Sequence, residues 1–538
     1  MGLRILVTDK LAEEGVAILK AEPGVEVDMK VGIKPEDLKA IIGQYDGICI
    51  RSETKLTADV LSNPGKLRAI ARAGVGVDNV DLPTATRHGI VVMNAPDGNT
   101  ISTCELTMGL MLAVSRHIAD ACASFKAGKW EKKLFMGNLL AGKTIGIIGL
   151  GRIGSAVAKR CLAFDMKVIG YDPFVAGVAQ ELSKHIRIAK TLDELLKEAN
   201  ILTVHTPMTD ETRGIIGKKE LMMLPKGAIV INAARGGIIS EKDLVEVLNT
   251  GHLGGAGIDV YTKEPPEDRT LVDHPKVTAL PHLGASSQEA QRNVSIDACH
   301  NIVDYLAGRE LRGAVNVPAI DFAAAGALKP YAEIGHRIGA LVAGIMHGRL
   351  KRLVVTYAGD IAKEPYKMVT ISVIMGLLQR VVSTPLNPVN AMMVAKEYGL
   401  EISERTSSDA RGYVSSVRVL AEGDLESHSV YGTVFHGHYP RITAIDDFYM
   451  EMKPEGDLVI TFNEDRPGVI GEVGMTFGKH GINIASMTFG RKTETKESCL
   501  ALSLDTVPPA NVLEDLRGKP FMKRVHHVSL PPLVSESA

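Results

Sequence analysis

The sequence predicts an α/β protein in which two domains with parallel sheets precede an α+β domain and a small βαββαβ domain. Short apolar runs alternate with helical patterns as far as Pro281, which is the rhythm of βαβ units. Only 4% of the residues are aromatic and 53 of 538 are glycine, which suits buried strands with helices packed closely on them. A chain of 538 residues exceeds one hydrophobic core, and about 150 residues per domain gives three or four domains.

The composition excludes several classes of protein. Lys and Arg number 61 against 63 Asp and Glu, so no basic surface indicates a nucleic-acid partner. No apolar run reaches the eighteen residues of a membrane span, and the first residues carry no secretion leader. The six cysteines are scattered without a C-x-x-C pair. We therefore expect a cytoplasmic protein with reduced thiols and no metal site.

The first half of the chain divides into two modules. The runs "RILVTD", "DGICIR", "LRAIARAG" and "GIVVMNAP" are predicted strands of the first module, and the series opened by "GKTIGIIGLGRIG" forms the second. Long helical patterns at 100–126 and 285–308 provide two crossings between the modules, so the first module is discontinuous. We expect two Rossmann-like/flavodoxin-like parallel-sheet domains, a substrate-binding one at 1–98 and 286–316 and an NAD-binding one at 99–285.

The second half begins after a predicted linker, "NVPAIDFAAAGALKP", in which small residues and prolines cluster. Helical segments ("YKMVTISVIMGLLQRVV", "VNAMMVAKEYGL") and then alternating strands ("SSVRVLAEG", "SVYGTVFHG", "RITAIDDFYMEMK") indicate an α+β domain at 317–454. The last segment reads strand, helix, strand, strand, helix, strand, which predicts a βαββαβ domain at 455–532.

A dinucleotide signal opens the second module. In "TIGIIGLGRIGSAVAKR" an apolar strand runs into Gly149, Gly151 and Gly154, and a helix follows at once. The glycines then allow a tight turn, close approach of a pyrophosphate and close packing of helix on strand. Asp172 ends the next strand, where a carboxylate accepts from both ribose hydroxyls and repels a 2′-phosphate. We expect NAD rather than NADP, with Arg152 as a candidate contact to the pyrophosphate.

Three charged residues follow strands of the same module. Arg235 lies in "NAARGG", Glu264 in "DVYTKEPP" and His282 in "PHLGASS", each beyond a predicted strand. Each residue type taken singly is more often structural than catalytic. Together they converge at the carboxyl edge of one sheet, where open α/β sheets bind ligands. A guanidinium there can clamp a carboxylate, and a histidine can exchange a proton.

These motifs, with "HTPMTDETRGII", stand in an order and spacing that resembles the D-isomer-specific 2-hydroxyacid dehydrogenase family over residues 1 to about 315. The resemblance implies that His282 is the acid/base, that Glu264 stabilises its imidazolium and that Arg235 binds the substrate's carboxylate and carbonyl. It also implies an NAD cleft to which Arg235 and His282 contribute together with Val75, Gly149, Gly151, Arg152, Ile153, Gly154, Asp172, Thr206, Ala233, Ala234, Asp259, Leu283, Gly284 and Ala285, with Asp259 near the nicotinamide carboxamide.

The loops of the first module suggest the substrate. Arg51, Ser52 and Arg72 follow predicted strands, and "KWEKKLFMG" adds Lys132 and Lys133, which could reach a neighbouring subunit of a homo-oligomer, a dimer or tetramer. A phosphorylated substrate needs such positive charge opposite the carboxylate clamp. As a group these residues resemble those of family members that act on D-3-phosphoglycerate in L-serine biosynthesis. A glyoxylate or hydroxypyruvate reductase, another D-2-hydroxyacid dehydrogenase and a non-catalytic NAD-sensing corepressor-like protein remain alternatives.

The second half bears on the choice between these alternatives. Residues 331–454 resemble the intervening domain of long members of the family, and the last domain resembles an ACT (ferredoxin-like) domain, which binds amino acids. In "FNEDRPGVI" and "HGINIAS", Asn463, Asp465 and Asn483 are candidates to bind an amino-acid effector, for which L-serine is expected. The alternative is that Asp465 caps the following helix and Asn483 makes a turn.

Overall fold

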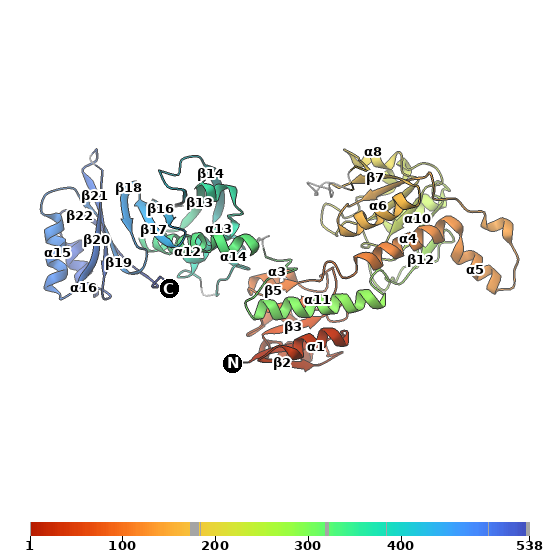
Figure 1. The fold of residues 1–538 in the computed structure, drawn as a ribbon, viewed down its shortest axis with the longest axis horizontal. Coiled ribbons are helices and arrows are strands. Elements are labelled where there is room, and N and C mark those ends of the chain that lie inside the picture. The colour runs from red at the N-terminus through yellow and green to blue at the C-terminus, as the bar shows by residue number, and fades with distance from the viewer. Residues whose placement is uncertain are drawn as a thin grey trace.

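The computed structural model describes residues 2–172, 182, 184–317, 322–382, 385–492 and 494–533. It confirms the predicted fold class: two parallel sheets are followed by a mixed sheet and an antiparallel one. Figure 1 shows the four units, with the terminal one at the far left and the second module at the upper right. Among the described residues no helix is long and apolar enough to cross a membrane. The domain boundaries and the cytoplasmic location stay predictions.

The first module has a five-stranded parallel sheet of order β2-β1-β3-β4-β5. The helix α11 packs on this sheet although it lies about 200 residues further along the chain than β5, and Met93 bridges to Ala314. The strand β2, which the sequence pattern missed, forms the sheet edge and is half exposed. The elements are β1 (Leu3–Val7), α1 (Glu13–Ala21), β2 (Val25–Met29), α2 (Pro35–Ile41), β3 (Gly47–Ile50), β4 (Ala69–Arg72), α3 (Leu82–Arg87), β5 (Val91–Met93) and α11 (Gln288–Leu306).

The second module has a seven-stranded parallel sheet of order β12-β11-β10-β9-β6-β7-β8. The helix α4 packs on it, and α5 projects away from the body in Figure 1. The elements are α4 (Thr100–Arg116), α5 (Ile118–Lys126), the short 3-10 helix η3 (Lys132–Phe135), β6 (Thr144–Ile148), α6 (Arg152–Ala163), β7 (Lys167–Tyr171), β8 (Arg187–Ile188), α8 (Leu192–Leu196), β9 (Ile201–Val204), α9 (Lys218–Met223), β10 (Ile229–Asn232), α10 (Glu241–Asn249), β11 (Gly255–Ile258) and β12 (Val277–Ala279).

The third unit corrects two predictions. The predicted linker is helical from Phe322, because α12 (Phe322–Ile345) starts inside it; the segment is rich in alanine, the best helix former. The predicted strand "RITAIDDFYMEMK" is a hairpin of β17 (Tyr439–Ile445) and β18 (Phe448–Met452), since Asp446 and Asp447 both have positive φ, as a two-residue turn requires. The other elements are β13 (Leu350–Gly359), α13 (Lys367–Leu378), α14 (Ala391–Glu397), β14 (Glu401–Ser407), β15 (Ser415–Gly423) and β16 (Ser427–Phe435).

The terminal unit is the predicted βαββαβ fold, with an antiparallel sheet of order β20-β21-β19-β22. Side chains of β19 belong to the same buried cluster as those of α12 and β13, so the third and terminal units share a core. The elements are β19 (Gly456–Glu464), α15 (Val469–Lys479), β20 (Ile484–Lys492), β21 (Glu497–Leu504), α16 (Ala510–Arg517) and β22 (Met522–Leu530).

Candidate active site

A cleft of about 590 Å³ lies between the first and second modules. Its walls come from loops at the carboxyl ends of strands in both sheets, the position where open parallel sheets bind ligands. The first module contributes Arg51, Ser52, Arg72, Val75 and Asp78 among others, and the second contributes Arg213, Arg235, Glu264, His282 and Ala285. The cleft therefore brings the predicted catalytic residues and most of the predicted substrate residues together.

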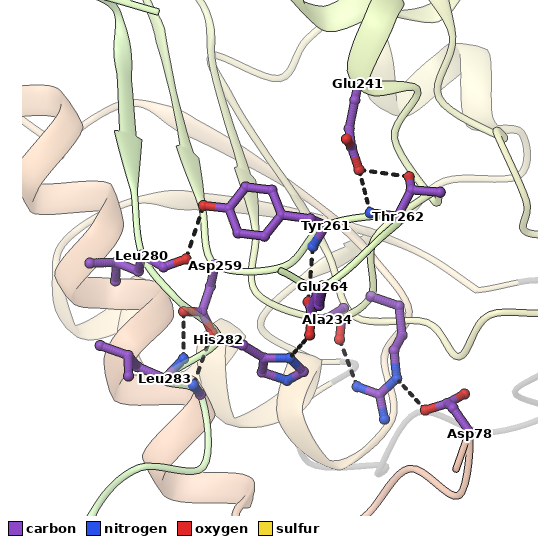
Figure 2. Close-up of polar contacts among 12 residues, drawn as sticks. Asp78, Ala234, Glu241, Asp259, Tyr261, Thr262, Glu264, Leu280, His282 and Leu283 are labelled. Carbon is purple, nitrogen blue, oxygen red and sulfur yellow. Dashed lines mark hydrogen bonds and ion pairs between the residues drawn. The ribbon is translucent and has the colours of Figure 1, made fainter. Parts of the chain in front are cut away.

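The proton-transfer pair has a defined geometry. Nδ1 of His282 lies 2.7 Å from Oε2 of Glu264, and Oε1 of the same carboxylate accepts from the amide of Tyr261 at 3.0 Å. Burial alone would raise the pKa of Glu264, but the hydrogen bonds from His282 and from the Tyr261 amide outweigh it and leave that pKa below its usual value. The lowered pKa favours the ionised carboxylate beside the imidazole, and Figure 2 shows the contact between the two side chains.

Asp259 orients the loop that carries His282. The carboxylate is fully buried and accepts from the amides of Leu283 at 2.7 Å and Gly284 at 2.9 Å. Burial raises the pKa of Asp259, and the two amides oppose that rise. These two hydrogen bonds fix the loop, and the position of Asp259 near the nicotinamide carboxamide stays a prediction. His282 itself has a φ of 56°, in the left-handed region, and this loop holds it there.

Arg235 reaches across the cleft toward the first module. Its Nε donates to Oδ2 of Asp78 at 3.2 Å and its Nη1 donates to the carbonyl of Ala234 at 2.7 Å. The side chain of Asn232 donates to the carbonyl of Arg235 at 2.9 Å and so fixes the backbone of this turn.

The glycine loop suits a dinucleotide. Gly149 has a φ of 91°, and a Cβ on Gly154 would lie 1.9 Å from the carbonyl oxygen of Gly149, so neither position accepts a side chain. A Cβ on Gly151 would meet nothing within 4 Å, which leaves open space beside the backbone at the start of α6. Asp172 accepts from the amide of Leu150 at 2.8 Å and stands at the end of β7. These features fit a pyrophosphate on the helix N-terminus and a ribose at Asp172.

Four other cofactor candidates have distinct surroundings. Thr206 is 7% exposed, and among the described residues its buried hydroxyl finds no hydrogen-bond partner, as expected of a group that serves a ligand. Ala233 is buried in the core beside β10, and Ile153 packs on the same core from α6. Arg152 forms an ion pair of 2.5 Å with Asp97 of the first module.

The opposite wall of the cleft is positively charged. The buried Nε atoms of Arg51 and Arg72 lack hydrogen-bond partners within the part of the chain that is described. Burial lowers the pKa of Arg72 to about 10, and the positive charge of Arg235 acts in the same direction. Asp9 fixes the loop by accepting from the amides of Arg51 and Thr54. Nη1 of Arg51 donates to the carbonyl of Lys10 at 3.3 Å, but partly buried guanidinium groups that repel one another and keep such unpartnered N–H groups are suited to a phosphate.

Lys132 and Lys133 do not join this cleft within one chain. Both are exposed on η3, in the projecting segment that follows α5. Among the cleft residues that the sequence reasoning missed are Asp78, Asn99 and Arg213. The buried Oδ1 of Asn99 has no partner among the described residues, although Asn99 occupies the N-cap position of α4. Asparagine is common at N-caps, so the sequence suggests an ordinary cap for Asn99. That its side chain makes no cap hydrogen bond is visible only in the structure.

The three effector candidates do not form one site within the chain. Asp465 lines a pocket of about 320 Å³ at the start of α15 with Arg491, and the Arg491 guanidinium binds its carboxylate at 2.7 Å; it does not cap α15. Asn463 is buried and donates to Ser498 at 2.6 Å, and Asn483 donates to Asp505 at 2.6 Å. Only Asp465 of the three faces this pocket.

The fold and cleft are those of an NAD-dependent dehydrogenase of 2-hydroxyacids, and family models match the second module, the third unit and the terminal domain. The NAD binding domain of D-isomer specific 2-hydroxyacid dehydrogenases matches residues 108–284, the D-3-phosphoglycerate dehydrogenase intervening domain matches 327–446, and the ACT domain matches 458–520. NAD is therefore the cofactor.

The chain belongs to the D-3-phosphoglycerate dehydrogenase family. It is 41% identical to the D-3-phosphoglycerate dehydrogenase of Methanocaldococcus jannaschii, over 98% of this chain and 100% of the relative. The enzyme of Bacillus subtilis is 40% identical over the same shares. Among solved structures, the TT0316 protein of Thermus thermophilus is 35% identical with a TM-score of 0.53, covering 58% of this chain and 100% of that one.

Proposed function

We propose that the cleft oxidises D-3-phosphoglycerate to 3-phosphohydroxypyruvate with NAD, the first step of L-serine biosynthesis. The observation that carries the proposal is the pair of opposed charged walls: Arg235 beside His282 and Glu264 on one side, Arg51 and Arg72 on the other. A substrate with a carboxylate at one end and a phosphate at the other matches both walls. Full-length relatives at 40–41% identity bear the name of this activity.

The residues divide the chemistry between them. Arg235 binds the carboxylate and the C2 oxygen, which places the C2 hydrogen toward the cofactor cleft. When bound there, NAD supplies the hydride acceptor. Since Nδ1 of His282 donates to Glu264, its Nε2 carries the lone pair that takes the hydroxyl proton, and the carboxylate of Glu264 stabilises the resulting imidazolium. In the reverse direction the same imidazolium returns the proton to the carbonyl oxygen.

A substrate panel in both directions tests the proposal. The purified protein should form NADH from D-3-phosphoglycerate and consume it with 3-phosphohydroxypyruvate, with NADP far less effective because of Asp172. Arg51→Ala and Arg72→Gln should each raise the KM for the phosphorylated substrate tenfold or more, by about 1.5–3 kcal/mol per lost charged hydrogen bond, while KM for hydroxypyruvate changes little. Arg292→Ala, on the outer ion pair with Glu14, is the matched control. Better turnover of glyoxylate than of the phosphorylated acid would favour a reductase instead.

We also propose that the protein is a homo-oligomer, a dimer or tetramer, built through the projecting segment. Large apolar side chains are more than half exposed there: Ile118, Phe125, Trp130, Leu134, Met136 and Leu139. A second copy of the chain would cover them, and would bring Lys132 and Lys133 toward a neighbouring cleft. Trp130→Asp should lower the mass measured by light scattering, and Lys132→Ala with Lys133→Ala should raise KM without changing that mass. An unchanged mass in Trp130→Asp would reject this interface.

L-serine is the proposed effector of the terminal domain. Asp465 supplies an acceptor for an ammonium group, and Asn463 and Asn483 would have to exchange their present partners, Ser498 and Asp505, to contribute. Titration with L-serine should lower kcat/KM and raise the melting temperature, and Asp465→Asn should remove both effects. Glycine and D-serine are the matched controls, and equal responses to all three amino acids would contradict a specific site.

A further inference from the structure

Two ion pairs join the first and second modules, and each joins a carboxylate of the first module to an arginine that is a candidate to bind a ligand. Asp78 holds Arg235 and Asp97 holds Arg152. We propose that these two aspartates are built-in stand-in anions: Asp78 occupies the place of the substrate carboxylate, and Asp97 that of the pyrophosphate, until the ligand displaces it. The inference rests on the proposed function and adds two residues that set affinity.

The hydrogen bonds of Arg235 identify the edge of its guanidinium for which Asp78 and a substrate carboxylate would compete. Nη1 donates to the carbonyl of Ala234, which engages one side of the guanidinium, and Nε donates to Asp78 on the other. Gly76 packs against this second edge, because a Cβ there would lie 1.9 Å from Nη2 and 2.7 Å from Oδ2 of Asp78. The missing side chain at Gly76 is what lets the pair form. A carboxylate that binds the Nε and Nη2 edge with both oxygens must therefore displace Asp78.

The surrounding charges explain why a counter-ion is needed before a substrate binds. Arg51, Arg72 and Arg235 share one cleft, so like charges repel across it. The pKa of Arg72 is lowered by burial first and by Arg235 second, while Asp78 opposes this. Asp78 thus offsets the repulsion before the substrate arrives. The substrate brings its own carboxylate and phosphate. The carboxylate of Asp78 then competes with the substrate carboxylate for Arg235.

The same arrangement holds at the cofactor end. Arg152 is the first residue of α6, and Asp97 lies in the loop between β5 and α4. Its carboxylate lies 2.5 Å from Nε of Arg152, so an anion stands close to the helix N-terminus where a pyrophosphate binds. The side chains of Arg152 and Asp97 are 58% and 70% exposed. Exposed pairs of this kind are weak, which makes them exchangeable.

The first experiment replaces Asp78. Asp78→Asn should lower the KM for D-3-phosphoglycerate and the inhibition constant of phosphoglycolate by a common factor of about two to five, the range for an exposed ion pair. Glycerol 3-phosphate, which lacks the carboxylate, should bind as before. Asp78→Glu should behave like the unaltered protein. Asp59→Asn is the matched control, because its side chain is 75% exposed and pairs with Lys39 outside the cleft. A higher KM or a tenfold lower kcat in Asp78→Asn would show that Asp78 positions Arg235 for catalysis and would overturn the proposal.

The second experiment needs no turnover. Asp97→Asn should tighten NADH and ADP-ribose about two- to fivefold, measured by fluorescence and calorimetry, and leave adenosine binding unchanged. Weaker or equal binding of ADP-ribose would reject the role of Asp97. These titrations separate the two proposals: failure of the unaltered protein to oxidise D-3-phosphoglycerate refutes the function, whereas the effect of Asp97→Asn on the pyrophosphate site can still be read.

Discussion

Replacing Glu264 by glutamine tests the proton-transfer pair directly. Glutamine keeps the shape of the side chain, and its Oε1 can still accept from the Tyr261 amide, which lies 3.0 Å from the carboxylate oxygen. The change removes only the charge that lies 2.7 Å from Nδ1 of His282. A hydrogen bond to a charged group contributes about 1.5–3 kcal/mol. The side chains of His282 and Glu264 are 47% and 37% exposed, so water screens the interaction between them. The lower half of this free-energy range therefore applies.

About 1.5–2.2 kcal/mol corresponds to a fall in kcat of roughly 10- to 40-fold. The KM should change less than threefold, because in the proposed site Arg235, Arg51 and Arg72 hold the substrate. The assay is NADH absorbance in both directions, with the melting temperature measured in parallel. Glu267→Gln is the matched control in the same loop, where Glu267 pairs with Lys263 at 2.6 Å on the surface. A fall in kcat of less than threefold with an unchanged melting temperature would refute the role given to Glu264.

The pH dependence of this pair follows from the sign of the shift. The pKa of Glu264 in the folded protein lies below its ordinary value of 4.5, since hydrogen bonds from His282 and the Tyr261 amide outweigh the effect of burial. The group thus contributes stability above pH 4.5 that is lost as the pH falls through the lowered folded value. At neutral and alkaline pH Glu264 stays charged, so its titration does not shape the activity profile there.

Three further predictions concern other parts of the fold. Gly151→Ala should weaken NAD binding at least tenfold without lowering the melting temperature, whereas Gly154→Ala should lower both, because its Cβ would lie 1.9 Å from the carbonyl of Gly149. Burial lowers the pKa of His526 from 6.5 to about 4, so up to about 3 kcal/mol of stability should be lost as the pH falls from 6.5 toward 4; thermal denaturation of His526→Gln should show a weaker pH dependence. Asn387→Ala removes a 2.8 Å hydrogen bond from the third unit to the first module and should lower the melting temperature, at a cost of about 1–3 kcal/mol.

The sequence predicted that the three catalytic candidates come together in one cleft because each of them is tied to a local pattern. Arg235, Glu264 and His282 each follow a strand, and the carboxyl ends of parallel strands lie at one edge of a sheet. The glycine loop was predictable for the same reason: strand, turn and helix are contiguous in the chain.

Residues that meet across modules were not predictable in this way. Asp78 and Arg235 are 157 positions apart, and their contact depends on how the two modules are set relative to each other. Asn463 illustrates a different limit. Its position in the turn suggested a ligand contact, but the side chain is fully buried and satisfied by Ser498 on the neighbouring strand. Pairing across strands decides this, and a single sequence does not record it.

The third unit connects the terminal domain with the catalytic modules. Phe462 and neighbouring side chains of β19 lie in the core of this unit, and Val389 from its other end packs in the core of the first module. Asn387 donates to the carbonyl of Gly89, next to α3, whose preceding loop carries Asp78. Packed cores transmit displacement better than flexible tethers because they resist compression. The described contacts therefore form a continuous packed path from β19 to Gly89, at the end of α3, and the loop before the same helix carries Asp78, the partner of Arg235.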